Sequence, residues 1–190
     1  MIILGMTPQL ASADANSDIG GGSLSADAHL KLKVVIPGFL LFRVGSAGAT
    51  VDTITFDMTN CVTTGTCTVG DSNAFNSGTG GDAAGGNGAN VALFSNAGAI
   101  TITATNDGGG SGLVSGSNSI SLAEITANSD NSSLATPTLT NAGNDTSNPA
   151  LNGGTNVTNQ TAVWTYSYDN TTVPDPGTYN VEITYTAANL

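Results

Sequence analysis

Side chains that could perform acid–base, nucleophilic or metal chemistry are scarce in this sequence and unevenly placed. Its 190 residues include only three basic side chains and one histidine. All four fall within fifteen consecutive positions: His29, Lys31, Lys33 and Arg43. The 14 acidic residues give a formal net charge of −11. A catalytic base, a metal cage or a phosphate clamp therefore has few residues from which it could be built.

The candidate catalytic groups lack the motifs that usually accompany them. His29 could activate a serine, but no Gly-x-Ser-x-Gly elbow occurs in the sequence. Carboxylate pairs such as Asp52 with Asp57 could act as acid and base or bind calcium, yet no Asp-x-Asp-x-Asp-Gly loop occurs. We therefore expect no catalytic residues, no metal site and no cofactor, and a solvated or interface-facing imidazole at His29.

Two cysteines, Cys61 and Cys67, lie six positions apart with Gly65 between them. We predict a disulfide that closes a short hairpin, which favours an oxidising compartment and a secreted protein. Two reduced thiols are the alternative. A metal pair is less favoured, because His29 is the only histidine that could complete a ligand set.

Three aromatic residues, Trp164, Tyr166 and Tyr168, alternate along one predicted strand. On an exposed sheet face they could stack on sugar rings, which would make surface glycans a partner. The stronger interpretation is that they are core or edge-of-core residues, because the chain has only ten aromatic side chains in total. The sequence leaves both interpretations open.

The hydrophobic pattern indicates an all-β fold. Apolar residues recur with period two, and no window sustains a helical spacing. In the first predicted strand, residues 28–35, the even positions form a buried face and His29, Lys31 and Lys33 form a wet face. The other candidate strands are residues 39–44, 54–58, 91–94, 99–104, 119–125, 162–168 and 178–186, with the cysteine hairpin over 61–69. Residues 70–90 are expected to form a long surface loop.

This pattern predicts a β-sandwich of about nine short strands, immunoglobulin-like or jelly-roll. The chain length fits a single domain, which we place at residues 28–190. Residues 14–27 are expected to be a flexible arm. Residues 1–13 resemble a signal-peptide remnant with an Ala-x-Ala pattern at Ala11 and Ala13, or else form an ordered apolar segment.

The composition also limits the partners. The acidic balance disfavours nucleic acid, because phosphates would be repelled. No segment reaches the ~18 apolar residues that a membrane span requires, so we expect none. Charged residues make up only 9% of the chain, well below the usual ~25%. A secreted structural or adhesive protein is the class that these features favour.

Two segments carry a family resemblance: Leu32-Lys-Val-Val-Ile-Pro-Gly-Phe-Leu-Leu-Phe-Arg-Val-Gly45 and Pro176-Gly-Thr-Tyr-Asn-Val-Glu-Ile-Thr-Tyr-Thr186. They resemble the first and last strands of secreted bacterial surface β-sandwiches, namely pilin-like fimbrial subunits, spore-coat-U-like proteins and cell-wall WxL domains. The resemblance implies an immunoglobulin-like subunit of an extracellular filament. The chain departs from chaperone-usher pilins in its short-range cysteine pair, and it has no obvious donor extension unless residues 1–10 or 19–30 serve.

The function expected from the sequence is a self-assembling subunit of an extracellular, fimbria-like filament. The arm could add a strand to the sheet edge of a neighbouring copy. His29, Lys31, Lys33 and Arg43 would then contact the acidic surface of that copy. The alternative is a carbohydrate-binding or adhesive module, and a secreted hydrolase is the third and least favoured hypothesis.

Overall fold

The computed structural model describes residues 16–48 and 50–189. Residues 1–13, the predicted signal-peptide remnant, lie outside the described residues. The chain divides into two units, and the compact one begins at Gly38. Residues 28–37, which we had expected to open the domain, therefore lie outside it. All strands of the described residues lie in the compact unit.

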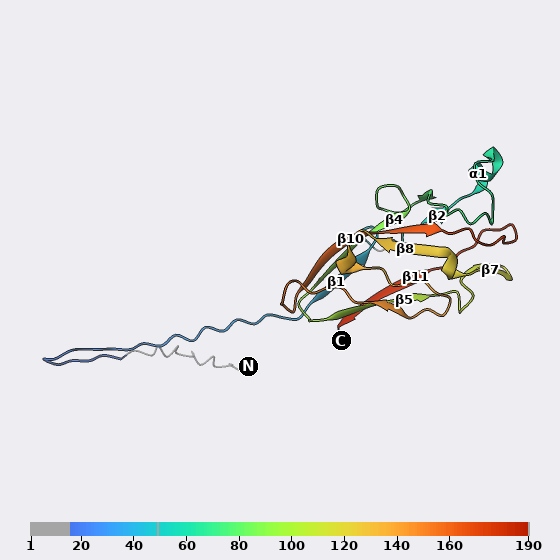
Figure 1. The fold of residues 1–190 in the computed structure, drawn as a ribbon. Coiled ribbons are helices and arrows are strands. Elements are labelled where there is room, and N and C mark those ends of the chain that lie inside the picture. Colours follow the sequence, from blue (N-terminus) through green and yellow to red (C-terminus); the bar gives the residue numbers. More distant parts are fainter. Residues whose placement is uncertain (1–15, 49, 190) are drawn as a thin grey trace, which may run out of the picture. The chain divides into compact units, whose positions relative to one another are not determined.

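The compact unit is built mainly from strands (Figure 1). The strands are β1 (Leu40–Val44), β2 (Thr55–Phe56), β3 (Gly78–Thr79), β4 (Gly88–Ser95), β5 (Ile100–Asn106), β6 (Leu113–Ser115), β7 (Asn118–Ile120), β8 (Ile125–Ser129), β9 (Asp145–Ser147), β10 (Thr158–Tyr168) and β11 (Ile183–Asn189). The helices are α1 (Thr59–Thr64) and the 3-10 turns η1 (Leu122–Glu124) and η2 (Ser132–Leu134). The all-β prediction is confirmed.

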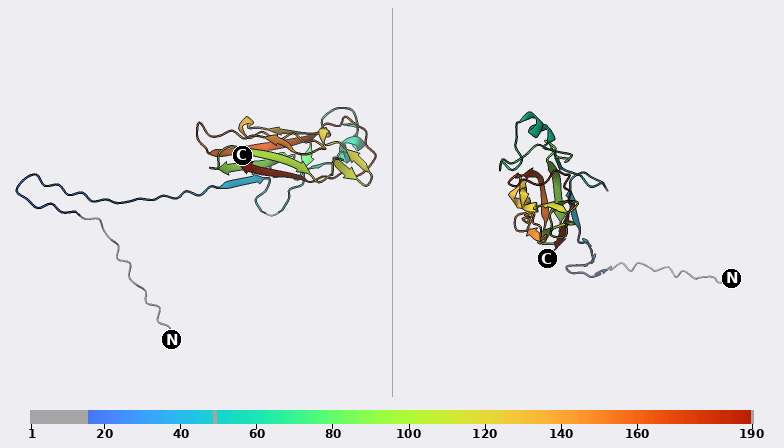
Figure 2. Two further views of the ribbon diagram at one scale, coloured as in Figure 1. Left: turned by 90° about the horizontal axis from the view of Figure 1, so that it is seen from below. Right: turned by 90° about the vertical axis from the view of Figure 1, so that its right-hand side faces the viewer.

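Two antiparallel sheets form the body of the sandwich. The larger has the strand order β1-β4-β10-β8, and the smaller has the order β11-β5-β9. β2 pairs with β3 and β6 pairs with β7 in two further small sheets. Figure 2 shows β5 and β11 side by side, in agreement with their seven-residue register from Ile100↔Asn189 to Asn106↔Ile183.

The core lies between the two larger sheets. The inward residues of the central strands are almost fully buried and belong to one hydrophobic cluster: Ala89, Val91, Leu93, Ile100, Ile102, Ala104, Ala162, Trp164 and Tyr166. In each strand they occupy every second position, because successive side chains of a strand point to opposite faces. Threonines such as Thr101 and Thr103 occupy alternate positions of β5, as the sequence pattern predicts.

Several predicted element boundaries differ from the structure. The region predicted as strand 119–125 contains the end of β7 and the turn η1 before β8 begins. The predicted strand 178–186 starts later, at Ile183, because Asn180 instead forms an isolated bridge with Val114. The strand predicted at 54–58 is reduced to β2, paired over two positions with β3.

Candidate assembly site on the arm and at the open edge of the sandwich

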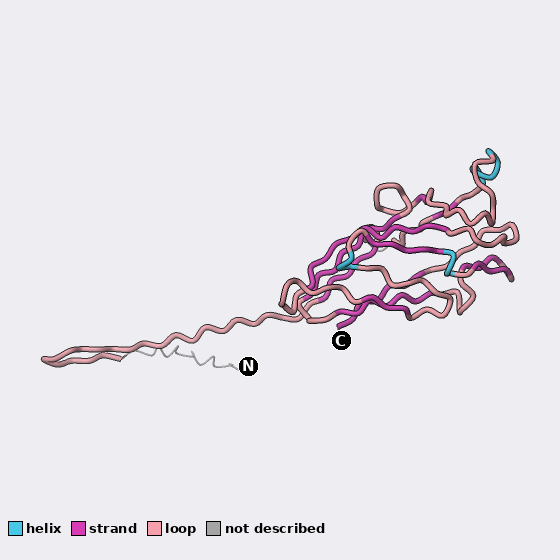
Figure 3. The backbone as a smooth tube through the Cα atoms, in the orientation of Figure 1, coloured by secondary structure: helices cyan, strands magenta, loops and turns pink. Residues whose placement is uncertain are grey.

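The N-terminal arm, defined here as residues 16–37, has no regular secondary structure (Figure 3). All of its residues are exposed. Leu30, Leu32 and Val34, predicted to form the buried face of a strand, are 84%, 85% and 82% exposed. The prediction of a strand with one buried face over 28–35 is therefore wrong for the single chain. The period-two alternation is present, but nothing within the arm covers its apolar side.

The four predicted contact residues are divided between the two units. His29, Lys31 and Lys33 are exposed residues of the arm. Arg43 is exposed on β1, opposite Ala92 of β4. Residues 28–37 contain both lysines and no carboxylate, whereas eleven of the 14 acidic residues follow Pro37. The arm thus carries a short basic segment on a chain whose sandwich is strongly acidic.

One edge of the sandwich is incompletely covered. β1 and β11 are each the terminal strand of their sheet, and the two strands contact each other (Figure 2). The apolar side chains near this edge remain only partly buried although they pack against the core: Phe42, Val44, Ile183, Tyr185 and Ala187. We call these five residues the open seam. Burying the apolar surface that these side chains still expose would be favourable.

The opposite edge, formed by β8 and β9, is closed by the chain itself. Leu134 and Leu139 from the segment after β8 are buried in the core. The Thr136 hydroxyl donates to the Ala127 carbonyl of β8 at 3.1 Å. The Thr140 hydroxyl donates to Asp145 of β9 at 2.5 Å. Residues 132–140 therefore span from one sheet to the other and cover this edge.

The three candidate platform aromatics are core residues. Trp164 is completely buried, and its indole N–H donates to the Leu134 carbonyl at 2.9 Å. Its ring lies edge-on to Tyr185 of β11 with a centroid separation of 5.1 Å. Tyr166 and Tyr168 are also buried. Of the two interpretations left open by the sequence, the structure supports the core, and these residues do not form an exposed sugar-stacking surface.

Tyr166 of the core and Tyr185 of the open seam have perturbed ionisation. The hydroxyls of Tyr166 and Tyr185 are hydrogen-bonded at 3.1 Å. Burial raises the pKa of Tyr166 to about 12, although the hydrogen bond with Tyr185 opposes the shift. Burial also raises the pKa of Tyr185 well above its ordinary value, and the neighbouring Tyr166 adds to the shift. This hydroxyl pair joins Tyr166 of β10 to Tyr185, a residue of the open seam on β11.

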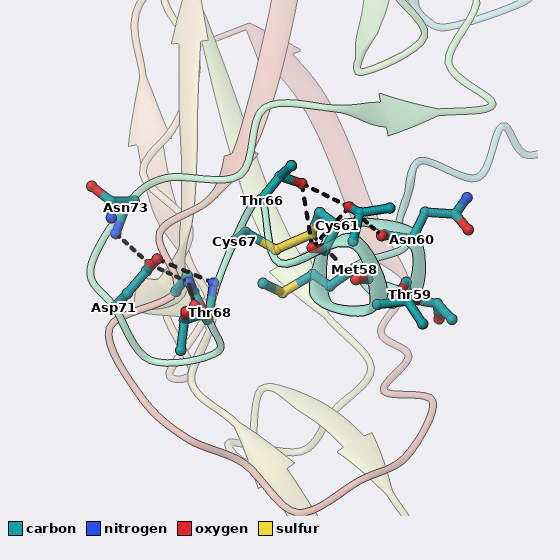
Figure 4. The surroundings of a disulfide bond; sticks show 12 residues. Met58, Thr59, Asn60, Cys61, Thr66, Cys67, Thr68, Asp71 and Asn73 are labelled. Atoms are coloured by element: carbon teal, nitrogen blue, oxygen red, sulfur yellow. Dashed lines mark hydrogen bonds between the residues drawn. A yellow bond between two sulfur atoms is a disulfide. The ribbon is translucent and has the colours of Figure 1, made fainter.

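The predicted disulfide between Cys61 and Cys67 is confirmed, with the two Cα atoms 5.2 Å apart (Figure 4). The predicted hairpin is wrong, because Cys61 lies in α1. Gly65 ends this helix in the left-handed conformation with φ +72°, a common helix end. None of the helix residues is buried. The disulfide therefore fixes a peripheral turn and contributes nothing to the core.

Two buried polar residues that the sequence analysis missed fix the neighbouring loops. Asn170 is 1% exposed, and its amide donates to Asp71 at 2.7 Å and to the Thr68 carbonyl at 2.8 Å. The buried Glu124 carboxylate accepts from the Thr171 backbone N–H at 2.8 Å and from the Thr171 hydroxyl. Asn170 has φ +55°, which Asn tolerates better than most residues. The Tyr-Asp-Asn ending of the strand was the available signal for a turn here.

Other types of site were also sought. Within residues 16–48 and 50–189, no cluster of three or more His, Cys, Asp or Glu side chains is arranged to hold a metal ion. None of the helices in this part of the chain has the length and apolar character needed to cross a membrane. Comparison with protein-family models, curated proteins and solved structures found no match. The arm and the open seam are therefore the features that bear on function.

Proposed function

We propose that this chain is a structural subunit of an extracellular filament and that it associates with other copies of itself by strand addition. The observation that carries the proposal is the exposed apolar side of the arm. Leu30, Leu32 and Val34 alternate with polar side chains as in a half-buried strand, yet each is more than four-fifths exposed. An alternating segment without a covered face is suited to complete the sheet of another molecule.

The covalent and electrostatic features are consistent with this role. The Cys61–Cys67 disulfide is of a kind that persists outside the cytosol. The basic segment of the arm and the acidic sandwich favour contact between copies. We propose an architectural role and assign no catalytic residue. Burial of Trp164, Tyr166 and Tyr168 argues against the carbohydrate-binding alternative.

Negative-stain electron microscopy of the purified full-length chain tests the proposal. We expect filaments or linear oligomers at concentrations where the arm is intact. A control sample treated with a protease that removes the exposed arm should contain only single particles, because exposed unstructured segments are cleaved first. Monodisperse particles of the full-length chain, with mass spectrometry confirming an intact N-terminus, would contradict the proposal.

A further inference from the structure

The apolar side of the arm is longer than the strand that the sequence analysis assigned. Every even position from 24 to 36 is apolar: Leu24, Ala26, Ala28, Leu30, Leu32, Val34 and Ile36. The odd positions from 25 to 33 are polar or charged. All these residues are exposed. An extended segment of this length measures about 40 Å, longer than any strand of the sandwich. We call the seven even positions the apolar face of the arm.

From this face we infer that residues 24–36 of one copy add to the free edge of β11 in a second copy and lay their apolar face over the open seam. This inference rests on the proposed function and specifies its donor and acceptor. β11 is the longer of the two edge strands at the seam. Its inward residues Ile183, Tyr185 and Ala187 are among the partly covered ones.

Among the described residues, both edges of the two larger sheets carry partly buried apolar side chains, Ile125 and Ala127 on β8 included, but the edge of β1 and β11 suits this donor better. At the β8 and β9 edge, residues 132–140 already cover the core, with Leu134 fully buried. The inward residues of β9 are Asp145 and Ser147, level with Ala104 and Ile102 of β5, and offer no apolar surface. At the β1 and β11 edge, the seam is apolar throughout. The covering segment 132–140 and the polar inward residues of β9 therefore favour the seam over the opposite edge.

The chain's own arm is poorly suited to pair with its own β1. Phe39 is already bonded to Asn96, the residue after β4, because its N–H donates to the Asn96 side chain at 2.8 Å and its carbonyl accepts from the Asn96 N–H at 3.3 Å. A hairpin turning at Pro37 and Gly38 would place residue 33 opposite residue 42. Directly opposite residues share a face of the sheet, so Lys33 would join Phe42 in the core.

The turn itself opposes such a hairpin. The favoured two-residue hairpin turns require a positive φ at their first position. Pro37 would occupy that position, and its ring fixes φ near −65°. Pairing with a second copy needs no turn at Pro37 and Gly38.

The donor and the acceptor are different surfaces, the arm and the edge of β11. Each copy would therefore donate its arm to one neighbour and accept the arm of another, and the contact would propagate head to tail instead of closing a symmetric dimer.

Thiol labelling of the assembled full-length chain tests which side of the arm is covered. The native cysteines are both in the disulfide, so an introduced cysteine is the only free thiol. We compare L30C and L32C with the matched controls K31C and K33C under non-reducing conditions. L30C and L32C should react with a maleimide at about one tenth of the rate of K31C and K33C, or more slowly still. Their reaction requires the arm to separate from the strand that it pairs with. All four should react equally in denaturant.

Disulfide trapping between two variants tests the acceptor. Chains carrying K33C or K31C are mixed with chains carrying T186C or T184C, whose side chains are exposed on β11. Oxidation should give a heterodimer on a non-reducing gel. The matched control T146C places a thiol on the exposed side of β9, at the other edge of the same sheet, and should give little cross-linked product.

The outcomes separate the inference from the function on which it rests. Assembly with equal labelling of even and odd positions, or cross-linking to β9 as efficient as to β11, would overturn the inference and leave self-association standing. Cross-links that form within one chain at high dilution, in a variant with both cysteines, would overturn the role of a second copy. Absence of assembly together with a freely labelled arm would overturn both proposals.

Discussion

Strand β5 and the arm carry the same alternation of side chains but differ completely in burial. In β5, Ile100 and Ile102 are 1% and 0% exposed. In the arm, Leu30 and Leu32 are 84% and 85% exposed. β5 lies between β11 and β9 and faces the other sheet, whereas residues 16–37 of the arm belong to no sheet. A period-two pattern therefore identifies the apolar face of a segment, but not whether other strands bury that face.

Apolar truncations in the core and in the arm should differ widely in their effect on the free energy of unfolding. Trp164→Ala should lower the free energy of unfolding by ~3–5 kcal/mol, because it leaves a cavity and orphans the Leu134 carbonyl. Leu32→Ala in the arm should change it by less than about 0.5 kcal/mol in the unassembled protein. Urea unfolding followed by tryptophan fluorescence measures Leu32→Ala, and circular dichroism measures both. Equal destabilisation by the two variants would contradict the assignment of core and arm.

Alkaline pH should weaken the sandwich by ionising the hydrogen-bonded pair of Tyr166 and Tyr185. The pKa of Tyr166 is raised to about 12 in the folded chain, against an unfolded value near 10. The folded state thus holds its proton more tightly, so this contribution is complete below pH ~10 and is lost as pH rises toward 12. The expected slope is about 1.4 kcal/mol per pH unit for each such group.

The control for this pH dependence is Tyr166→Phe, which removes one titrating hydroxyl and leaves the ring. The variant should show a shallower loss of stability between pH ~10 and 12 than the wild type. Urea unfolding at a series of pH values gives both curves. A wild-type stability that stays constant over this range would show that the hydroxyl pair is not buried as described.

The sequence was informative where the strands that cover an apolar face belong to the sandwich itself. Alternation correctly identified the region of β5 and its apolar face, because its partners are in the sandwich. It misassigned residues 28–35 because a strand was assumed to find its cover locally. The pattern could have shown that the apolar face runs from Leu24 to Ile36, since all seven even positions are apolar.

The cysteine region shows a second reason for failure. Gly65 between two nearby cysteines indicates a chain reversal, and the reversal is present, with Gly65 at φ +72°. The same signal fits a hairpin turn and the left-handed end of a helix. Local sequence did not distinguish the hairpin turn from the helix end. A turn signal does precede α1, because the Asp57 carboxylate accepts a hydrogen bond from the Thr59 N–H. The buried roles of Asn170 and Glu124 depend on loops far apart in sequence and were not predictable from local pattern.

Removing the disulfide should loosen the α1 turn and leave the sandwich folded. A short closed loop of this size is expected to stabilise by about 2 kcal/mol at most. Because no residue of α1 is buried, that effect should be confined to local opening. Hydrogen exchange of the C61S/C67S double variant should show faster exchange in residues 59–67 and unchanged exchange in β4 and β5. Global unfolding of the variant under native conditions would contradict this expectation.

The basic side of the arm should have the smallest effect. Exposed ion pairs between Lys31 or Lys33 and an acidic neighbour contribute only ~0.2–1 kcal/mol each and are screened by salt. Reversing both lysines in K31E/K33E should therefore slow assembly at low salt and matter little at high salt, without changing the melting temperature. Light scattering during assembly measures both rates. Wild-type rates at every salt concentration would mean that these lysines do not guide the contact.

Sedimentation velocity of three full-length chains tests the central claim, that the apolar face of the arm joins the copies. The wild type is compared with L30S/L32S, which alters the apolar face, and with K31S/K33S, which alters the opposite side by the same number of serines. We predict that the wild type and K31S/K33S sediment as oligomers and that L30S/L32S sediments as an 18.8 kDa monomer. A monomeric wild type, or oligomers of equal size in all three chains, would contradict the account.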